Sequence, residues 1–429
     1  MKIKIYTLGC KVNQYESEAM QELLIKNGYE AASDGEYADV TIINSCAVTS
    51  SGESKAVRLM HRIRRETPET VIVLTGCMAQ TLPEGDKRAS EADIILGNKR
   101  REDILNVLND YFENRRRITF IPPYESHDEY EVLTVSSFSD RTRAFLKIED
   151  GCNRFCSYCI IPYARGRVRS TSLDKIKGSI KTFEENGYKE VVVVGINLSC
   201  YGQDIGESFR NGIITACEAG NVRIRLGSLE PESMDEETLR AFAGYKNFCP
   251  QFHLSLQSGC AETLKRMNRH YSPDEYAEIV RNIRSIFDNA AITTDVMVGF
   301  PGETEEEFRS SLEFVRSMGF AKVHVFPYSR RSGTVADRAS EQVPENVKKE
   351  RARLMTAAAE EKRLEFLRSQ IGRTEPVLIE TRTKEGCLEG YTPNYTPVLV
   401  EAADELINEI VNVRISRVED DGTVFGEIV

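Results

Sequence analysis

Residues 143–167 read RAFLKIEDGCNRFCSYCIIPYARGR and place three cysteines directly after a strand-like segment. Cys152, Cys156 and Cys159, the first triplet, have the spacing C-x3-C-x2-C. Iron–sulfur clusters are held by cysteine thiolates, and a tight loop can present three thiolates to three irons. An iron without a protein ligand is then open to a small molecule. The triplet therefore predicts a catalytic iron–sulfur centre.

A zinc site, or three incidental thiols, is the alternative interpretation of this loop. Structural zinc takes four ligands, and no further Cys or His lies close to the first triplet in the sequence. The chain has eleven cysteines in 429 residues and begins without a recognisable export signal, so a disulfide framework is not expected. The cluster interpretation is favoured.

The region around the first triplet alternates strand-like and helix-like patterns. Its strand-like runs are AFLKI, VVVVGIN, NVRIRLGS, QFHLSLQSG, ITTDVMVGF and KVHVFPYS. Helical patterns such as Ser272–Asn289 and Thr304–Met318 separate them, and Thr304 is expected to cap its helix. Six strand–helix units in a row favour a parallel, curved sheet. We predict a partial (βα)6 barrel within residues 141–366, and a long helix from Glu345 to about Gln370 that links it to a third unit.

The first 120 residues show the pattern of a small parallel α/β domain. The expected strands are Lys2–Thr7, Asp39–Ile43, Thr70–Thr75 and Asp93–Leu96. Helices are expected between them, such as Glu16–Asn27 and Ser54–Glu66. Cys10, Cys46 and Cys77, the second triplet, each follow one of the first three strands after a small residue. The carboxyl ends of parallel strands share one edge of a sheet, where ligands bind. We therefore predict that these thiols converge on a second iron–sulfur cluster.

The other cysteines share no spacing and are expected to serve packing: Cys200, Cys217, Cys249, Cys260 and Cys387.

Two further segments complete the predicted organisation. Residues 121–140 are polar and contain prolines, so they are expected to form a linker. Residues 367–429 contain the short β-rich runs PVLIET, TPVLVEA, EIVNVRISRV and TVFGEIV. Turn residues separate these runs, which favours a small C-terminal β-barrel. The predicted fold is α/β with three domains: 1–120, 141–366 and 367–429.

The net charge of −11 and isoelectric point near 5.3 give no general signature of nucleic-acid binding. RNA would have to be bound by local basic patches, on one helix face and around the first triplet. The candidates are Lys55, Arg58, Arg62, Arg65, Arg141, Arg143, Lys147, Arg154, Arg165, Arg167 and Arg169. Residues 372–429 hold five Lys or Arg against twelve Asp or Glu. This tail is expected to contact RNA through few residues: Arg414 and Arg417, or Tyr391, Asn394 and Tyr395 by contacts to bases.

The chain shows no stretch approaching the roughly 20 apolar residues that a membrane helix needs. Its start, MKIKIYTLGC, has a strand pattern rather than that of a signal peptide. We expect a cytoplasmic protein that makes no membrane contact and is a monomer.

The first triplet, with Tyr158 before its last cysteine, resembles the signature of radical S-adenosylmethionine (SAM) enzymes. The opening TLGCKVNQYESE, the NSC and TGC cysteines and a tail resembling a TRAM domain are similar to the methylthiotransferases of that family. The likeness covers essentially the whole chain. TLGCKVNQYE, DRTRAFLKIEDGCNRFCSYCIIPYARG and FPYSRRSGT are most similar to the MtaB type, which acts on threonylcarbamoyladenosine in tRNA.

The resemblance implies a tRNA methylthiotransferase with SAM and two 4Fe-4S clusters as cofactors. SAM would bind the open iron at the first triplet and be cleaved to a radical that abstracts hydrogen from carbon 2 of threonylcarbamoyladenosine. The cluster on the second triplet would supply sulfur, and a second SAM would methylate it. The implied partner is the tRNA anticodon stem-loop, with a sulfur donor and an electron donor that the sequence does not identify.

Four residues are implied to contact SAM: Tyr158, Asn197, Ser255 and Gln257. Asn197 ends the second barrel strand where relatives commonly have an acidic residue, which puts a charged contact with the SAM amino group in doubt. Ser255 and Gln257 end the fourth strand and are candidates for the SAM ribose. Glu230 and Asp295 occupy similar strand ends and are weaker candidates.

Three alternatives remain open at this point. Relatives that modify isopentenyladenosine in tRNA, or an aspartate of a ribosomal protein, share the same cysteines. A non-catalytic RNA-binding module that carries a metal cluster is the third, and the open iron disfavours it.

Overall fold

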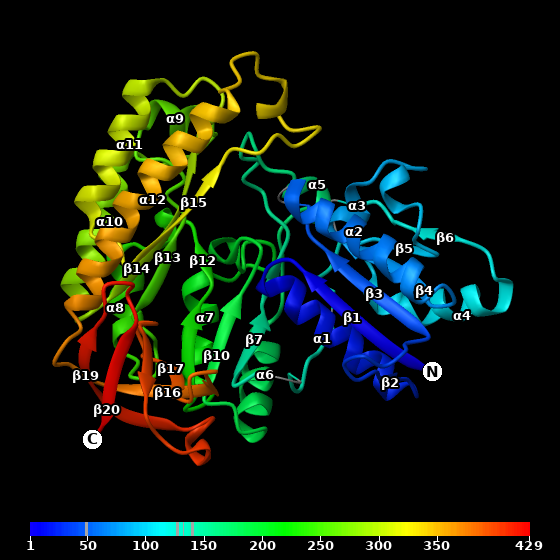
Figure 1. Cartoon of the computed structure of the whole chain (residues 1–429), viewed down its shortest axis with the longest axis horizontal. Coiled ribbons are helices and arrows are strands. Elements are labelled where there is room, and N and C mark those ends of the chain that lie inside the picture. The colour runs from blue at the N-terminus through cyan, green and yellow to red at the C-terminus, as the bar shows by residue number, and fades with distance from the viewer. Residues whose placement is uncertain (48–49, 126–127, 132, 139–140) are drawn as a thin grey trace.

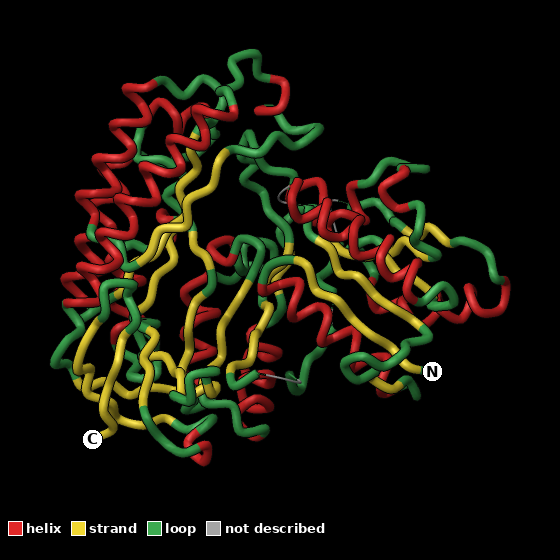
Figure 2. Tube along the Cα trace, viewed as in Figure 1, coloured by secondary structure: helices red, strands yellow, loops and turns green. Residues whose placement is uncertain are grey.

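The computed structural model describes all residues of the chain except 48–49, 126–127, 132 and 139–140. Three units follow one another along the chain (Figure 1). Figure 2 shows a helix-covered sheet at each side of the molecule and a group of strands at the base of the larger one. Among the described residues, every helix is too short or too polar to span a lipid bilayer.

The N-terminal unit is a parallel sheet in the order β2-β1-β3-β4-β5-β6. Its strands are β1 Lys2–Leu8, β2 Glu30–Ala31, β3 Val40–Ser45, β4 Val71–Gly76, β5 Ile94–Leu96 and β6 Ile118–Phe120. Its helices are α1 Lys11–Lys26, α2 Ser50–Glu66, α3 Cys77–Thr81 and α4 Ile104–Asn114. One apolar core joins α1 and α4 to one face of the sheet, and a second joins α2 and α3 to the other. β3 and β4 are buried throughout because both faces are covered.

The central unit is a curved parallel sheet whose strands lie in the order β7-β10-β11 and then β12-β13-β14-β15. Its strands are β7 Arg143–Lys147, β10 Glu190–Val194, β11 Arg223–Leu226, β12 Ser228–Leu229, β13 Gln251–Leu254, β14 Ala291–Val298 and β15 Lys322–Pro327. β11 and β12 are one strand interrupted at Gly227, so the sheet has six strand positions, as predicted for a partial (βα)6 barrel. A short two-stranded ribbon, β8 Glu149–Asp150 and β9 Arg169–Ser170, brackets the cysteine loop.

The helices of the central unit pack their apolar faces on the outside of this sheet. They are α6 Leu173–Glu185, α7 Phe209–Glu218, α8 Glu236–Ala243, α9 Ala261–Arg266, α10 Pro273–Ile286, α11 Glu305–Met318 and α12 Glu345–Arg368, with the short α5 Ile161–Arg165 next to the cysteine loop. Thr304 caps α11 through a reciprocal pair of bonds with Glu307, which confirms the predicted cap.

The C-terminal unit is a closed barrel in the order β16-β17-β18-β20-β19, as predicted. Its strands are β16 Thr374–Arg382, β17 Leu388–Tyr391, β18 Pro397–Val400, β19 Ile410–Val418 and β20 Val424–Ile428. All pairs are antiparallel except β18 with β20. The last turn of α12 contributes Leu367 to the barrel core, so the barrel is joined firmly to the central unit.

Some elements differ from the prediction. α1 begins at Lys11, directly after Cys10, rather than at Glu16. The short helices α3 and α5 were not predicted, because each has five residues and shows no measurable periodicity.

The segment 121–140 packs against both neighbouring units in its described residues. The apolar residues Leu133, Val135 and Phe138 lie in the core of the central unit. The Tyr130 hydroxyl donates to the Lys147 carbonyl oxygen at 2.7 Å. The connection is therefore docked rather than extended into solvent.

Candidate functional site

The first triplet lies in the loop after β8, at the carboxyl end of the barrel strands. Backbone N–H groups face two of its sulfurs: Arg154 N lies 3.5 Å from Cys152 Sγ, and Ile161 N lies 3.4 Å from Cys159 Sγ. Burial raises the pKa of Cys152 to about 11 and that of Cys159 to about 12. At neutral pH both thiols carry protons, which binding of iron must displace.

Two side chains from other strand ends reach the same sulfurs. Asn197, after β10, donates Nδ2 to Cys152 Sγ at 3.5 Å. Arg269, between α9 and α10, donates Nη1 to Cys156 Sγ at 3.5 Å and forms an ion pair with Glu230. Hydrogen bonds to sulfur and nearby charge set the potential of an iron–sulfur cluster. Arg269 was missed in the sequence, because it does not lie at a strand end.

Glu149 is the second residue that the sequence pattern did not reveal. It is fully buried, its Oε2 accepts from the Asn197 backbone N–H at 2.7 Å, and its Oε1 has no hydrogen-bond partner among the described residues. Burial raises the pKa of Glu149 well above its usual range. An ammonium group would satisfy this orphaned oxygen. The loop therefore fits SAM as well as a cluster.

Of the remaining residues predicted to contact SAM, Tyr158 belongs to this loop and Ser255 is linked to it through Arg269, whereas Gln257 contacts β14. Tyr158 packs edge-on against Phe300, with ring centroids 6.3 Å apart. The Ser255 carbonyl oxygen accepts from Arg269 Nη2 at 3.1 Å, so Arg269 ties that strand end to the first triplet. Gln257 has a left-handed backbone, with φ of +63°, and its N–H donates to the Asp295 carbonyl on β14.

The second triplet lies at one edge of the N-terminal sheet. The strand register aligns Leu8, Ser45 and Gly76 in one row, and the three cysteines follow within two residues of that row. Gly76 has a φ of +92°, and a Cβ atom there would lie 2.3 Å from the Ser45 carbonyl oxygen. The small residue before Cys77 is therefore required for close approach of the strands.

The two triplets meet across the boundary between the units. Cys77 packs with Ala47 and Ala164, beside Ile160 and Ile161. Ile160 directly follows Cys159 in the sequence. Figure 1 shows α3 and α5 side by side at this junction.

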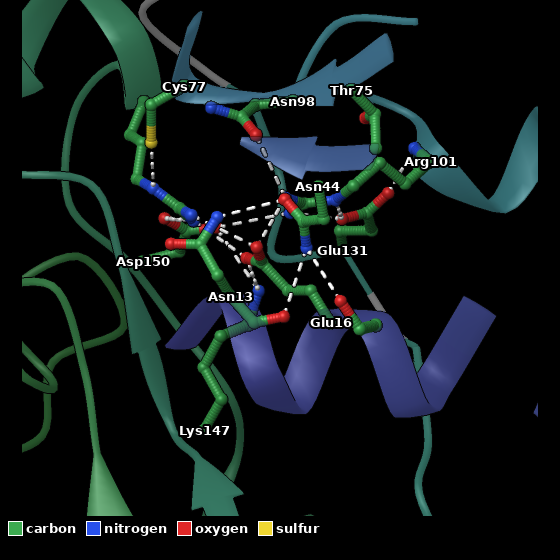
Figure 3. A network of polar contacts seen from close by, with 12 residues as sticks. Asn13, Glu16, Asn44, Thr75, Cys77, Asn98, Arg101, Glu131, Lys147 and Asp150 are labelled. Atoms are coloured by element: carbon green, nitrogen blue, oxygen red, sulfur yellow. Dashed lines mark hydrogen bonds and ion pairs between the residues drawn. The ribbon is translucent and has the colours of Figure 1, made fainter. Parts of the chain in front are cut away.

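Arg165 from α5 links the second triplet to a buried ionic network (Figure 3). Its Nε donates to Cys77 Sγ at 3.2 Å, and its terminal nitrogens bind the Glu16 carboxylate at 2.6 and 3.0 Å. Burial of Glu16 opposes ionisation, but Arg101, Arg165 and Lys147 outweigh it and lower the pKa of Glu16 to about 2. A cation from the central unit therefore lies at a thiol of the N-terminal unit.

The same network contains two further buried groups, Lys147 and Asp150. Lys147 Nζ lies 3.1 Å from both Glu16 and Asp150, and Arg165 lies 3.1 Å from Asp150. The prediction that Lys147, Arg165 and Arg169 contact RNA phosphates is wrong, because all three are buried beside these carboxylates. Removing one of these carboxylates would weaken the compensation of several buried cations at once.

The other basic residues predicted to contact RNA lie outside this buried network. Arg154 pairs with Glu232, and Arg143 pairs with Glu380. Lys55, Arg58, Arg62 and Arg65 are exposed on α2, and Arg167 is exposed beside the first triplet. Arg141 is exposed before the start of β7, at the opposite end of that strand from the triplet.

The tail residues predicted to contact RNA bases make contacts within the protein instead. Asn394 is 3% exposed and hydrogen-bonds to Gln370 and the Asn289 carbonyl, so a base contact there is wrong. Tyr391 and Tyr395 stack on each other at 4.7 Å, and the Arg143 guanidinium lies about 5 Å from both rings. These side chains join the C-terminal barrel to the base of the central one.

The sulfurs of each triplet do not surround a common point. Among the described residues, no three Cys, His, Asp or Glu side chains are placed to hold one metal ion. Ligands of a cluster bind different irons, so their sulfurs need not converge as they do around zinc. The set of thiols and N–H donors fits a cluster.

Three family models match the chain. They are the Radical SAM superfamily at residues 146–315, the uncharacterized protein family UPF0004 at residues 2–97 and the TRAM domain at residues 368–429.

Curated relatives match over nearly their whole length. Threonylcarbamoyladenosine tRNA methylthiotransferase MtaB of Bacillus subtilis is 37% identical over 96% of this chain and 93% of its own. The MtaB of Thermotoga maritima is 38% identical over 98% and 96%. The tRNA-2-methylthio-N(6)-dimethylallyladenosine synthase of Pelotomaculum thermopropionicum is 33% identical over 97% and 95%.

Solved structures share the fold at low identity. The radical SAM methyltransferase TsrM from Kitasatospora setae is 13% identical, with a TM-score of 0.57 over 76% of this chain and 72% of that one. The curated relatives and the family models identify the chain as a radical SAM methylthiotransferase that modifies tRNA and uses SAM and 4Fe-4S clusters.

Proposed function

We propose that the substrate is threonylcarbamoyladenosine next to the tRNA anticodon, and that its carbon 2 receives sulfur and then a methyl group. Relatives named for this nucleoside are 36–38% identical, against 33–35% for relatives named for dimethylallyladenosine. This difference supports the first substrate, with the dimethylallyl nucleoside as the second candidate.

We propose that each triplet holds one cluster. The observation that carries this assignment is the contact of Cys77 with Ala164 and Ile160. Ile160 directly follows Cys159 in the sequence, so the two triplets lie on adjacent segments. SAM and the clusters would supply the radical, the sulfur and the methyl group. The chain would hold the reactive carbon between two adjacent sulfur-lined loops and exclude water from them.

Five residues are proposed to hold SAM at the first triplet: Glu149, Tyr158, Asn197, Ser255 and Gln257. Asn197 has no carboxyl group to face the SAM amino group. Glu149 would supply one, because its Oε1 has no hydrogen-bond partner among the described residues. An ammonium beside it would lower the pKa of Glu149 and so favour the charged carboxylate.

Nucleoside analysis tests the substrate. The enzyme, reconstituted with iron and sulfide without oxygen, is incubated with SAM, a reductant and tRNA that carries either threonylcarbamoyladenosine or isopentenyladenosine. Mass spectrometry should show the methylthio product of the first only. A methylthio product of the second alone would overturn the substrate assignment.

Cysteine variants test the two roles. Cys152→Ala should abolish SAM cleavage, whereas Cys77→Ala should retain it and lose sulfur insertion. Iron should fall from about eight per chain to about four in each, as two 4Fe-4S clusters require. Cys217→Ala, on α7, is the matched control and should keep both activities. Equal loss of SAM cleavage in both variants would contradict separate roles.

We also propose 1–120, 141–366 and 367–429 as the domains, with 121–140 between them. The three sheets and the three matched family ranges fall inside these limits.

A further inference from the structure

Three side chains form an exposed patch next to the first triplet, here called the aromatic patch: Phe155, Tyr163 and Arg167. The Phe155 and Tyr163 rings meet edge-to-face with centroids 6.2 Å apart, and the Arg167 guanidinium lies 4.7 Å from the Phe155 centroid. Phe155 is 37% exposed and Tyr163 57% exposed. Large aromatic side chains at a protein surface commonly mark a binding site.

The backbone holds Phe155 in this position at a conformational cost. Its φ is +50°, in the left-handed region that a bulky residue rarely occupies. Asn268 Nδ2 donates to the carbonyl oxygens of Arg154 and Phe155 at 3.3 and 3.1 Å and fixes the turn. Strain of this kind persists where the surrounding structure requires it. The turn leaves the ring outside, although Phe155 lies between two residues of the triplet.

Arg167 differs from the arginines around it. Arg154, Arg165 and Arg169 face carboxylates. Among the described residues, no acidic side chain pairs with Arg167, and the contact of its guanidinium is the Phe155 ring. The patch therefore carries one uncompensated positive charge in a protein whose net charge is −11.

We propose that the aromatic patch stacks on a nucleobase of the tRNA anticodon loop that neighbours the modified adenosine. This inference rests on the chain acting on tRNA. Proteins read single-stranded RNA loops by stacking unpaired bases on aromatic rings and on guanidinium planes. Phe155 lies between Cys152 and Cys156, so a base held on the patch lies beside the loop at which we place SAM.

The composition of the patch favours a base over a phosphate or an apolar peptide. A phosphate site would need several basic groups, and Arg167 is a single one. An apolar peptide would gain nothing from an unpaired guanidinium beside the rings. A base offers a flat face to both rings and a π-system to the cation.

Equilibrium binding tests the proposal. The reconstituted enzyme is titrated anaerobically into fluorescently labelled tRNA, without reductant. Tyr163→Ala and Arg167→Gln should raise Kd by about five- to one-hundred-fold, as loss of one stacking contact predicts. Tyr163→Phe keeps the ring and should bind as wild type. Tyr37→Ala removes another exposed tyrosine, 47% exposed, which lies before β3 at the far end of that strand, and it should change nothing.

A second readout separates stacking from general weakening. With 2-aminopurine placed next to the modified adenosine, wild-type enzyme and Tyr163→Phe should change the fluorescence on binding through contact with the rings, and Tyr163→Ala should not. Iron content and SAM cleavage without tRNA should be the same in all variants. Unchanged Kd and fluorescence in Tyr163→Ala and Arg167→Gln would overturn the patch while leaving the tRNA function intact. Failure of wild-type enzyme to bind tRNA would overturn both.

Discussion

Arg269 sets the environment of Cys156 through one hydrogen bond to sulfur and one ion pair. Its guanidinium lies between Cys156 Sγ and the Glu230 carboxylate, and it is 4% exposed. A cation that donates to a cluster ligand stabilises the reduced, more negative cluster. Arg269→Gln should therefore lower the reduction potential of the cluster at the first triplet. The expected change is about 65 to 130 mV for this one-electron couple, as loss of a charged hydrogen bond of about 1.5–3 kcal/mol implies.

A redox titration followed by electron paramagnetic resonance measures this potential. Arg266→Gln is the matched control: Arg266 lies in the last turn of α9 and pairs with Glu307 rather than with sulfur. Its potential should equal that of wild type. An unchanged potential in Arg269→Gln would mean that Arg269 does not tune the cluster and only holds Glu230 in place.

At the scale of single residues, the sequence spacing predicted the two cysteine triplets, but it did not predict which arginines are buried and which are exposed. Arg165 and Arg167 are two residues apart and look equivalent in the sequence. The short helix α5 directs Arg165 into the boundary between units, where Glu16 compensates its charge. Arg167 follows the turn at Gly166 and is exposed. Which one is buried depends on a carboxylate 149 positions away, which no local pattern contains.

Helix α1 contributes a charged residue to the interface between units. It begins directly after Cys10 and carries Glu16, fully buried beside Arg101 and Arg165, on its second turn. Glu16→Gln would remove the carboxylate that Arg101 and Arg165 share, leaving Arg101 beside Glu131 and Arg165 beside Asp150. Removing one partner of a buried ion pair costs about 3–5 kcal/mol. Chemical denaturation of the metal-free protein at pH 7 should show this loss. Glu113→Gln, on the exposed side of α4, should show none.

The same carboxylate predicts an acid sensitivity. Burial opposes ionisation of Glu16, but the cations lower its pKa from 4.5 to about 2 in the folded protein. Between these values the unfolded chain binds more protons, so the stability that Glu16 contributes is lost as pH falls from about 4.5 toward 2. The difference in unfolding free energy between wild type and Glu16→Gln should shrink over that range. A constant difference would show that Glu16 is not the titrating group.

At the scale of elements, most strands were predicted, but the short strands β2 and β6 and the start of α1 were not. The start of α1 reads KVNQYE, which looks polar, yet Asn13 and Glu16 are buried. Asn13 bonds to Asn44 at the end of β3, and Glu16 joins the ionic network. A helix that buries polar residues against another unit has no apolar stripe from which its start could be recognised.

Over the whole molecule, the order and type of the three units could be predicted, but their contacts could not. The strand RIRL reads as an ordinary alternating strand, yet Arg223 and Arg225 both point to the base of the central barrel. Arg225 bonds to Glu190 and to the carbonyl oxygens of Thr392 and Pro393, and Arg223 bonds to the Pro376 carbonyl. The acidic C-terminal barrel is thus held by arginines of the central one, a pairing between units that periodicity does not encode.

Tyr395 is the central contact of this docking. Its ring lies 4.9 Å from the Arg143 guanidinium and 4.7 Å from that of Arg225. Each such contact contributes about 0.5–2 kcal/mol. Tyr395→Ala should therefore loosen the C-terminal barrel without unfolding it, because the barrel keeps its own apolar core. Hydrogen exchange in residues 391–396 should accelerate about five- to one-hundred-fold, since exchange of locally opened amides follows the opening free energy.

Arg414→Gln is the control for this prediction, because Arg414 pairs with Glu427 on the exposed side of the same barrel. It should leave exchange in residues 391–396 unchanged. Iron content and SAM cleavage should stay at wild-type values in Tyr395→Ala, since both triplets lie at the opposite, carboxyl end of the strands. Unchanged exchange in Tyr395→Ala would mean that the arginine bonds to backbone carbonyls hold the barrel by themselves.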